Sequence, residues 1–234
     1  MFVNEKILLV EDDQSISEMV NNQLMKEGFM VETAFDGEEG IERFSKQSFD
    51  LIILDLMIPK IDGLECLKLI RERSLIPILI MSAKDGDVNK ALGLGFGADD
   101  YITKPFSMIE LIARVKAAIR RATDYSKVVK KVDSEVIHFG TLTIDISNFS
   151  AHKNGKNLKL TSKEFHILKL FISNPNQVFT KAQVYNKIWN EDYFGDENVI
   201  NVHIKRLRGK IEDDPSKPQY IKTLWGIGYK LGEP

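Results

Sequence analysis

The sequence is poor in cysteine and has no long apolar run. Cys66 is the only cysteine in 234 residues, which excludes an internal disulfide framework. No run of about eighteen apolar residues occurs, which argues against a membrane-spanning helix. The amino terminus also lacks the basic-then-apolar pattern of a secretory signal. These absences favour a protein of the reducing cytoplasm with no membrane partner.

The net charge is also small, −2, but this value conceals two halves of opposite sign. With 43% hydrophobic and 28% charged residues, the chain has a globular composition and enough length for two domains. Residues 1–122 carry 15 Lys+Arg and 21 Asp+Glu, a net −6, whereas residues 123–234 carry 17 and 13, a net +4. Opposite signs suggest different partners, with nucleic acid an option for the basic half. Ordinary surface variation is the alternative.

An apolar strand that ends in a carboxylate organises the first half. Four successive apolar residues, 51–54, are typical of a strand covered on both faces in a parallel sheet. Asp55 then lies at the carboxyl end of this strand, where ligands bind in open α/β sheets. Taken alone, Asp55 could equally cap the following turn.

Strands and helices alternate through the rest of this half. We expect strands at 6–10, 30–35, 50–56, 77–81 and 99–103. Helices are expected up to residue 28 and then at 37–45, 62–73, 85–96 and 107–121. With right-handed crossovers, this order predicts a doubly wound five-stranded parallel sheet, an α/β fold of the flavodoxin type.

Polar residues follow four of these strands and should meet at one edge of the sheet: Glu11 and Asp12, Asp55, Ser82 and Lys104. Three neighbouring carboxylates repel one another unless a hard divalent cation neutralises them. Oxygen ligands without His or Cys indicate Mg²⁺ or Mn²⁺. Lys104 and the Ser82 hydroxyl, together with the metal, could hold a phosphoryl group on Asp55.

Four motifs of this half resemble the receiver domain of bacterial two-component response regulators. They are Glu11-Asp12-Asp13, Leu54-Asp55-Leu56-Met57-Ile58-Pro59, Met81-Ser82-Ala83 and Asp99-Asp100-Tyr101-Ile102-Thr103-Lys104-Pro105-Phe106. The resemblance implies that Glu11, Asp12 and Asp55 organise magnesium, with the backbone carbonyl of Met57 as a further ligand. It also implies that a sensor histidine kinase phosphorylates Asp55.

The same resemblance implies a switch and a dimer face. Ser82 and Tyr101 would be paired switch residues, and the Lys104-Pro105 peptide bond would be cis. The fourth and fifth helices and the fifth strand would form the face of a homodimer that assembles on phosphorylation. The expected pairs between subunits are Lys90 with Glu110, Asp100 with Arg114 and Asp99 with Arg121.

The second half has a different pattern. Residues 123–133 are polar and are interpreted as a linker between a domain at 1–122 and one at 134–234. Short strands at 136–139, 142–145 and 149–152, with an Asn154-Gly155 turn, predict a small antiparallel sheet. Helices open at the capping-box patterns of Thr161 and Thr180, a third runs over 197–212, and residues 220–231 predict a β-hairpin.

The helix at 197–212 carries the candidate DNA-reading residues. Its apolar stripe is Ile200, Ile204, Leu207 and Ile211, and the opposite face is expected to present Asn198, Val202 and Arg206. We expect Arg206 to contact a guanine and Val202 a thymine methyl. The cations placed to meet phosphates are Lys205, Arg208 and Lys210. A basic helix face is, on its own, more often only a solvated one.

The sheet, helices and hairpin resemble the winged-helix effector domain of the OmpR/PhoB subfamily, an α+β domain. The motifs are Leu160-Thr161-Ser162-Lys163-Glu164-Phe165, Val202-His203-Ile204-Lys205-Arg206-Leu207-Arg208 and Gly226-Ile227-Gly228-Tyr229. The resemblance implies double-stranded DNA with tandem half-sites, and RNA polymerase as a further partner. Trp225 stands where many members have an arginine, so Lys222, Thr223 and Lys230 are expected to contact phosphates.

Two other protein classes share parts of this pattern. A magnesium-dependent phosphohydrolase with an aspartyl nucleophile usually has a second Asp two residues later, where this chain has Met57, which cannot donate a proton. A flavodoxin-like cofactor binder shares the sheet, but the acidic cluster would repel a cofactor phosphate. The sequence therefore favours a transcriptional regulator that catalyses only its own phosphoryl transfer and slow dephosphorylation.

Overall fold

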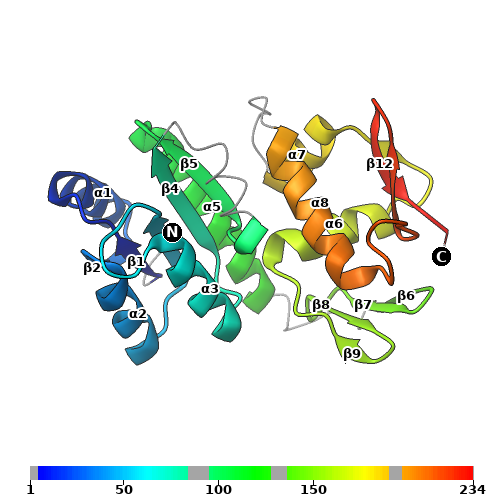
Figure 1. The fold of residues 1–234 in the computed structure, drawn as a ribbon, viewed down its shortest axis with the longest axis horizontal. Helices are drawn as coiled ribbons and strands as arrows, with labels where there is room; N and C mark the ends of the chain where they lie inside the picture. The colour runs from blue at the N-terminus through cyan, green and yellow to red at the C-terminus, as the bar shows by residue number, and fades with distance from the viewer. Residues whose placement is uncertain (1–4, 84–94, 128–135, 190–196, 234) are drawn as a thin grey trace. The chain divides into compact units, whose positions relative to one another are not determined.

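The computed structural model describes residues 5–83, 95–127, 136–189 and 197–233. The chain divides into two compact units, Met1–Ala122 and Thr123–Pro234 (Figure 1). Within the described ranges, no helix has the length and apolar character needed to cross a membrane.

A five-stranded parallel sheet forms the first unit, which confirms the predicted fold class. Its strands are β1 (Lys6–Val10), β2 (Met30–Ala34), β3 (Leu51–Asp55), β4 (Ile78–Ala83) and β5 (Asp100–Lys104). They lie in the order β2-β1-β3-β4-β5, so the chain first extends the sheet on one side of β1 and then on the other. The order therefore reverses between β1 and β3, and such a reversal is where open α/β sheets bind ligands.

Helices cover both faces of this sheet (Figure 1). They are α1 (Gln14–Lys26), α2 (Gly37–Lys46), α3 (Gly63–Arg73) and α5 (Met108–Lys127). Apolar residues of α1 and α5 share one buried cluster with alternate residues of all the strands except β2. On the other face α2 packs against α3, and Gly40 lets α2 approach the side chain of Val10 closely.

Three of these helices begin at an aspartate. The side chains of Asp13, Asp36 and Asp62 accept hydrogen bonds from the backbone N–H groups three residues later, which satisfies donors that the helix leaves open. Because Asp13 caps α1, its carboxylate is occupied by the helix end. Asp13 is therefore separate from the group of three acids, Glu11, Asp12 and Asp55, that lie together.

The end of α5 differs from the prediction. The helix continues to Lys127, so residues 123–127 of the expected linker are helical. This stretch is polar but contains neither Gly nor Pro, and polar character alone does not end a helix. The rest of that linker, and most of the helix expected at 85–96, lie outside the described residues.

In the described residues of the second unit there are two antiparallel sheets and three helices. The first sheet is β6 (Val136–Phe139), β7 (Leu142–Asp145), β8 (Ser150–Lys153) and β9 (Lys156–Asn157), in chain order. The helices are α6 (Ser162–Ile172), α7 (Lys181–Trp189) and α8 (Glu197–Ile211). The hairpin of β11 (Ile221–Leu224) and β12 (Gly228–Leu231) pairs with β10 (Val178–Phe179) in the second sheet. This arrangement is consistent with the predicted winged helix, although two-residue β10 was too short to show a strand pattern.

Both predicted capping boxes of this unit are present. The Thr161 hydroxyl accepts from the Glu164 N–H, and the Glu164 carboxylate accepts from the Thr161 N–H at 2.9 Å. At α7, the Gln183 N–H donates to the Thr180 hydroxyl at 3.1 Å, and the Thr180 N–H donates to the Gln183 side chain at 2.9 Å. Reciprocal bonds of this kind fix where each helix starts.

Candidate phosphoryl-acceptor and DNA-binding sites

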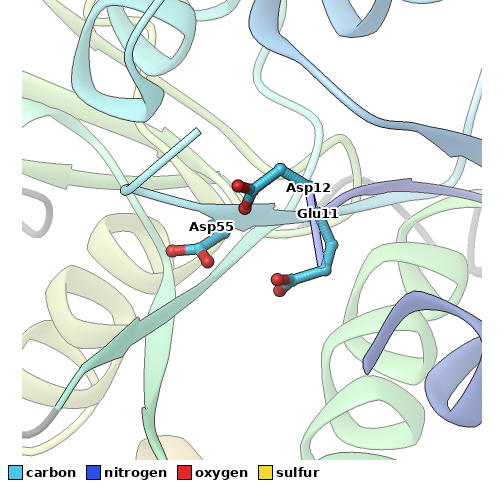
Figure 2. Close-up of side chains that lie close together, drawn as sticks. All are labelled: Glu11, Asp12 and Asp55. Atoms are coloured by element: carbon cyan, nitrogen blue, oxygen red, sulfur yellow. The ribbon is translucent and has the colours of Figure 1, made fainter. Parts of the chain in front are cut away.

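Three carboxylates meet where the strand order reverses. Figure 2 shows Glu11, Asp12 and Asp55 close together. One carboxylate oxygen of each lies within 4.8 Å of the others. The register explains this, because Val10 of β1 lies beside Leu54 of β3, which brings the following residues of both strands together. Glu11 and Asp55 are buried, while Asp12 is exposed. The sequence prediction of a carboxylate cluster at this edge is thus matched by the geometry.

Lys104 reaches the cluster from the end of β5. Its Nζ donates to Asp55 Oδ2 at 2.5 Å and to the two oxygens of Glu11 at 2.8 and 2.7 Å. The backbone N–H of Met57 donates to the other oxygen of Asp55, Oδ1, at 3.0 Å. Both oxygens of Asp55 are therefore held by donors from different segments. Three carboxylates against one ammonium leave an excess of negative charge, which suits a hard divalent cation with oxygen ligands.

The ionisation of the site reflects this crowding. Burial and the neighbouring Asp55 raise the pKa of Glu11, although Lys104 acts in the opposite direction. Burial opposes the charge of Lys104, but its hydrogen bonds to Asp55 and Glu11 outweigh burial and raise its pKa. Lys104 therefore stays protonated at neutral pH. A buried carboxylate whose charged form is disfavoured is a ligand that a cation would stabilise.

The other predicted receiver residues lie on the neighbouring strands. Backbone pairing places Ser82 of β4 beside Thr103 of β5, while the Ser82 side chain is outside the described part of the structure. Tyr101 is half-buried in β5. The Lys104–Pro105 peptide bond is cis, as expected. The side chain of Met57 is exposed beside the cluster.

Two of the acids expected to pair across a dimer are engaged within the chain. Arg114 binds Asp100 through Nη1 at 3.1 Å and Glu110 through Nη2 at 2.9 Å. Asp100 and Arg114 are both buried in this pair. In the single chain, Arg114 of the same molecule therefore binds both Asp100 and Glu110, the two acids that were expected to pair with residues of another subunit.

Asp99 is held by an arginine that the sequence did not single out. Arg71, from the last turn of α3, lies 2.8 Å from Asp99 Oδ2, and this oxygen also accepts from the Ile78 N–H at 3.0 Å. Arg71 also donates to the carbonyl of Gly97 at 2.8 Å. Asp99 therefore joins α3 to the start of β5 inside the unit. Its expected partner Arg121, and Lys90, have side chains outside the described residues.

The expected orientation of Arg206 is wrong. Its Nη2 lies 2.9 Å from Oε1 of Glu164, a fully buried residue of α6, and its side chain is only 15% exposed. The reason is that Val199 and His203 are also buried, so the core-facing side of α8 is wider than the predicted stripe. At 100° per residue this moves the centre of the exposed face away from Arg206 and toward Lys205, which is exposed.

Two further cations of α8 are also bound within the protein. Lys210 Nζ lies 2.6 Å from Glu164 Oε2, so the buried carboxylate has two positive partners. Arg208 donates to the carbonyl of Ile221 at 3.0 and 2.6 Å and to the Thr223 hydroxyl at 2.8 Å, in the first strand of the hairpin. Burial lowers the pKa of Arg208. Both residues, which were expected to meet phosphates, are thus bonded within the protein: Lys210 supports α6, and Arg208 supports the hairpin.

The hairpin that follows α8 is referred to below as the wing, residues 221–231. The Glu212 carboxylate accepts from the backbone N–H groups of Gln219 at 2.7 Å, Tyr220 at 3.0 Å and Ile221 at 3.0 Å. Together with Arg208, it fixes the start of the wing against the end of α8. Sequence reasoning missed this contact, because an acid at the end of a helix carries no pattern that names its partner.

The remaining predicted DNA contacts differ in exposure. In the wing, Lys230 and Trp225 are exposed, and Lys222 and Thr223 are half-buried. On α8, Val202 is half-buried, and the side chain of Asn198 lies outside the described residues. Asn201 was not predicted. It is exposed on α8, and its side-chain oxygen accepts from the hydroxyl of the wing residue Tyr229 at 2.9 Å.

Known proteins match both units. The family described as "Response regulator receiver domain" matches residues 7–116, and "Transcriptional regulatory protein, C terminal" matches residues 155–231. The transcriptional regulatory protein YcbL of Bacillus subtilis (strain 168) is 66% identical over 97% of this chain and 100% of its own length. The alkaline phosphatase synthesis transcriptional regulatory protein PhoP of the same organism is 42% identical, over 99% of this chain and 98% of PhoP.

A solved structure extends the likeness to the whole chain. The response regulator DrrB, an OmpR/PhoB homologue of Thermotoga maritima, is 33% identical, with a TM-score of 0.51 over 98% of this chain and 100% of DrrB. Both units are therefore matched in sequence and in order. The chain belongs to the two-component response regulators of the OmpR/PhoB subfamily, in which a receiver domain precedes a DNA-binding domain.

Proposed function

We propose that Asp55 accepts a phosphoryl group from a sensor histidine kinase and that this modification controls DNA binding. The observation that carries the proposal is the environment of Asp55. Its carboxylate lies at the end of a central strand, beside two further acids and with Lys104 Nζ at 2.5 Å. An Asp that merely capped a turn would need none of these neighbours.

The chemistry proposed is a direct phosphoryl transfer. An oxygen of Asp55 attacks the phosphorus of the kinase's phosphohistidine, the new P–O bond forms as the P–N bond breaks, and the imidazole nitrogen leaves with the electron pair. Glu11, Asp12, Asp55 and the Met57 carbonyl would hold Mg²⁺ or Mn²⁺, which would offset the charge of the phosphoryl oxygens. Lys104, which is protonated and already beside Asp55, would transfer its hydrogen bond to one of these oxygens.

The proposed response spreads through the neighbouring strands. A phosphoryl group adds about −2 charge and three acceptor oxygens, which the Ser82 hydroxyl can meet from β4 while Tyr101 adjusts on β5. A dimer would then form on the face of β5 and α5, where Asp100, Glu110 and Arg114 could exchange their internal bonds for bonds between subunits. Such a dimer would bind tandem half-sites in the cytoplasm, with RNA polymerase as a further partner.

On the DNA we propose α8 as the helix that enters the major groove. Lys205 lies at the centre of its exposed face, with Asn198 and Val202 nearby on the helical wheel. Lys222, Thr223 and Lys230 of the wing would contact phosphates. Arg206 is not assigned to a base, because it is engaged with Glu164.

Acetyl phosphate tests the phosphoryl-acceptor proposal. The wild type should be phosphorylated once, in a reaction that stops in excess chelator, and Asp55→Asn should show no labelling. The matched control is Asp62→Asn: Asp62 is exposed and caps α3, and Asn caps a helix equally well. This control should be labelled like the wild type.

The same experiment separates the alternatives. Full labelling of Asp55→Asn would refute the assignment of the acceptor. Repeated turnover, with phosphate released continuously, would instead favour a phosphohydrolase. A single stable phosphorylation agrees with a regulator.

A further inference from the structure

The wing carries an apolar tip that faces solvent. Trp225 is 91% exposed, more than any other large apolar side chain in the described part of the chain, and Ile227 beside it is 60% exposed. Gly226 lies between them with φ +73°, in the turn that joins β11 to β12. A tryptophan can bury about 150–250 Å² on contact, yet Trp225 adds almost nothing to the core of its own unit. Its position suits a surface that becomes covered by a partner.

Two hollows flank this tip, and both are cationic. One, of about 540 Å³ beside α7 and α8, is lined by Lys181 and Arg208, and the other, of about 560 Å³, is lined by Arg208, Lys217 and Lys222. Trp225 lines both hollows. No acidic side chain is among the lining residues of either. An apolar tip between two cationic hollows is complementary to a DNA duplex, which has a polyanionic backbone outside and stacked, largely apolar bases inside.

The tip is also held in place relative to α8. Glu212 and Arg208 attach β11 to the end of that helix, and β12 pairs with β10. Gly228 has φ +156°, and a Cβ there would lie 2.0 Å from the carbonyl oxygen of Phe179, so the wing packs too closely for any larger residue. A helix fits the major groove, about 12 Å wide, and a hairpin fixed at its side meets the next groove along the duplex, the minor groove, about 6 Å wide.

We propose that Trp225, supported by Ile227, is a wedge that enters the minor groove and partly opens one base step. This inference rests on the proposal that α8 binds the major groove. An uncharged indole makes no ion pair with a phosphate and has a single N–H to donate, so we assign its main contribution to stacking and apolar contact. Pyrimidine–purine steps such as TA and CA/TG unstack most readily. Trp225 therefore adds a preference for a flexible step at a position that α8 does not touch.

Selection from a random-sequence duplex library tests the sequence preference. The wild type should enrich a flexible step at a constant distance from the motif read by α8. Trp225→Ala should enrich the same motif without that step, and should bind the wild-type duplexes about ten- to a hundredfold more weakly. Val136→Ala, which truncates an exposed apolar residue of β6, is the matched control and should behave like the wild type.

The salt dependence of binding distinguishes a wedge from an ion pair with a phosphate. Trp225→Ala should leave the slope of log K against log salt concentration unchanged, because it removes no charge. Lys222→Ala should lower this slope by about one unit. Thermal unfolding of Trp225→Ala should match the wild type because Trp225 is exposed, and Lys222→Ala, which truncates a half-buried side chain, should change it only slightly.

Tryptophan fluorescence observes the tip directly. The chain has only two tryptophans, and Trp189 is fully buried, so acrylamide should quench Trp225 alone in the free protein. Adding a selected duplex should protect Trp225 from acrylamide.

If Trp225 stays accessible in the complex, or if Trp225→Ala keeps the step preference, the wedge is wrong while reading by α8 stands. Protection that rises with protein concentration in the absence of DNA would make the tip a protein contact and overturn the wedge. If the wild type selects no duplex at all, the DNA-binding proposal fails and the wedge fails with it.

Discussion

Replacing Glu164 should destabilise the second unit more than any loss of a surface charge. Its carboxylate is fully buried, accepts from the Thr161 N–H at 2.9 Å, and lies 2.9 Å from Arg206 and 2.6 Å from Lys210. Glu164→Gln keeps an acceptor for the helix cap but removes the charge that both cations require. Glu164→Ala removes the acceptor as well and leaves a cavity.

The magnitudes follow from burial. Removing one partner of a buried ion pair costs about 3–5 kcal/mol, because the other charge is left without compensation. Arg206 and Lys210 are 15% and 29% exposed, so each can recover part of its hydration, which places Glu164→Gln at about 2–3 kcal/mol. Loss of the cap adds about 1 kcal/mol in Glu164→Ala. Such losses are a large share of a typical stability of about 5–15 kcal/mol.

Urea unfolding of the full chain, followed by the emission of buried Trp189, is the assay, because this tryptophan reports on the second unit. The matched control is Asp213→Asn, which removes the 2.7 Å pair with Lys153. Asp213 is 90% exposed, so its loss should cost about 1 kcal/mol or less. A double-mutant cycle of Glu164→Gln with Arg206→Met should show a coupling energy. If Glu164→Gln falls within the range of Asp213→Asn, the reasoning from burial is refuted.

Two other predictions concern the first unit. Burial raises the pKa of Cys66 from 9.0 to about 12, so its thiolate should be about a thousandfold rarer than in the unfolded chain. A thiol reagent at about pH 8 should therefore label the native protein correspondingly slowly. Labelling of the native protein at the rate of the unfolded chain would contradict this. Burial alone would raise the pKa of Glu32, but hydrogen bonds from Lys6, Gln47 and Arg43 lower it below the ordinary 4.5. The ionised carboxylate therefore stabilises the fold at pH values above 4.5, and this stabilisation is lost as the pH falls through the folded-state pKa. Glu32→Gln should therefore reduce stability at neutral pH by about 1 kcal/mol or less, since the side chain is 28% exposed, and a urea titration should show the difference fading below pH 4.5 rather than growing.

The phosphoryl-acceptor site could be predicted because its parts are covalently attached to recognisable strands. Glu11 directly follows β1, Asp55 ends β3 and Lys104 ends β5. Parallel strands bring their carboxyl ends to one edge, so knowing where each strand ends was sufficient to bring these side chains together. Only the register, in which Val10 lies beside Leu54, had to come from the structure.

The partners of long charged side chains could not be predicted in the same way. Periodicity indicates which face of a helix is buried, but it does not say which charge a neighbouring helix presents there. Glu164 fitted the pattern of a capping box, and it is one, yet the same carboxylate also binds Arg206 and Lys210 from α8. Arg71 fitted the basic last turn of α3, and nothing in its spacing pointed to Asp99, which lies 28 positions later.

These internal pairs change what the charge of the second half means. Its net +4 already includes the buried Glu164, but the sum does not show that this acid is paired with Arg206 and Lys210 and leaves these two cations less available to a partner. Arg208, which lines both hollows beside the wing, is at the same time bonded to β11, so it acts as a positioning residue as well as a source of positive potential. Exposed Lys205 and Lys230 are not tied in this way, and Lys205 lies at the centre of the exposed face of α8. The affinity of this domain for DNA should therefore depend mainly on exposed lysines such as Lys205 and Lys230, and less on the cations that are paired inside the fold. Its sequence preference should depend on the side chains that the fold positions near these lysines, such as Trp225.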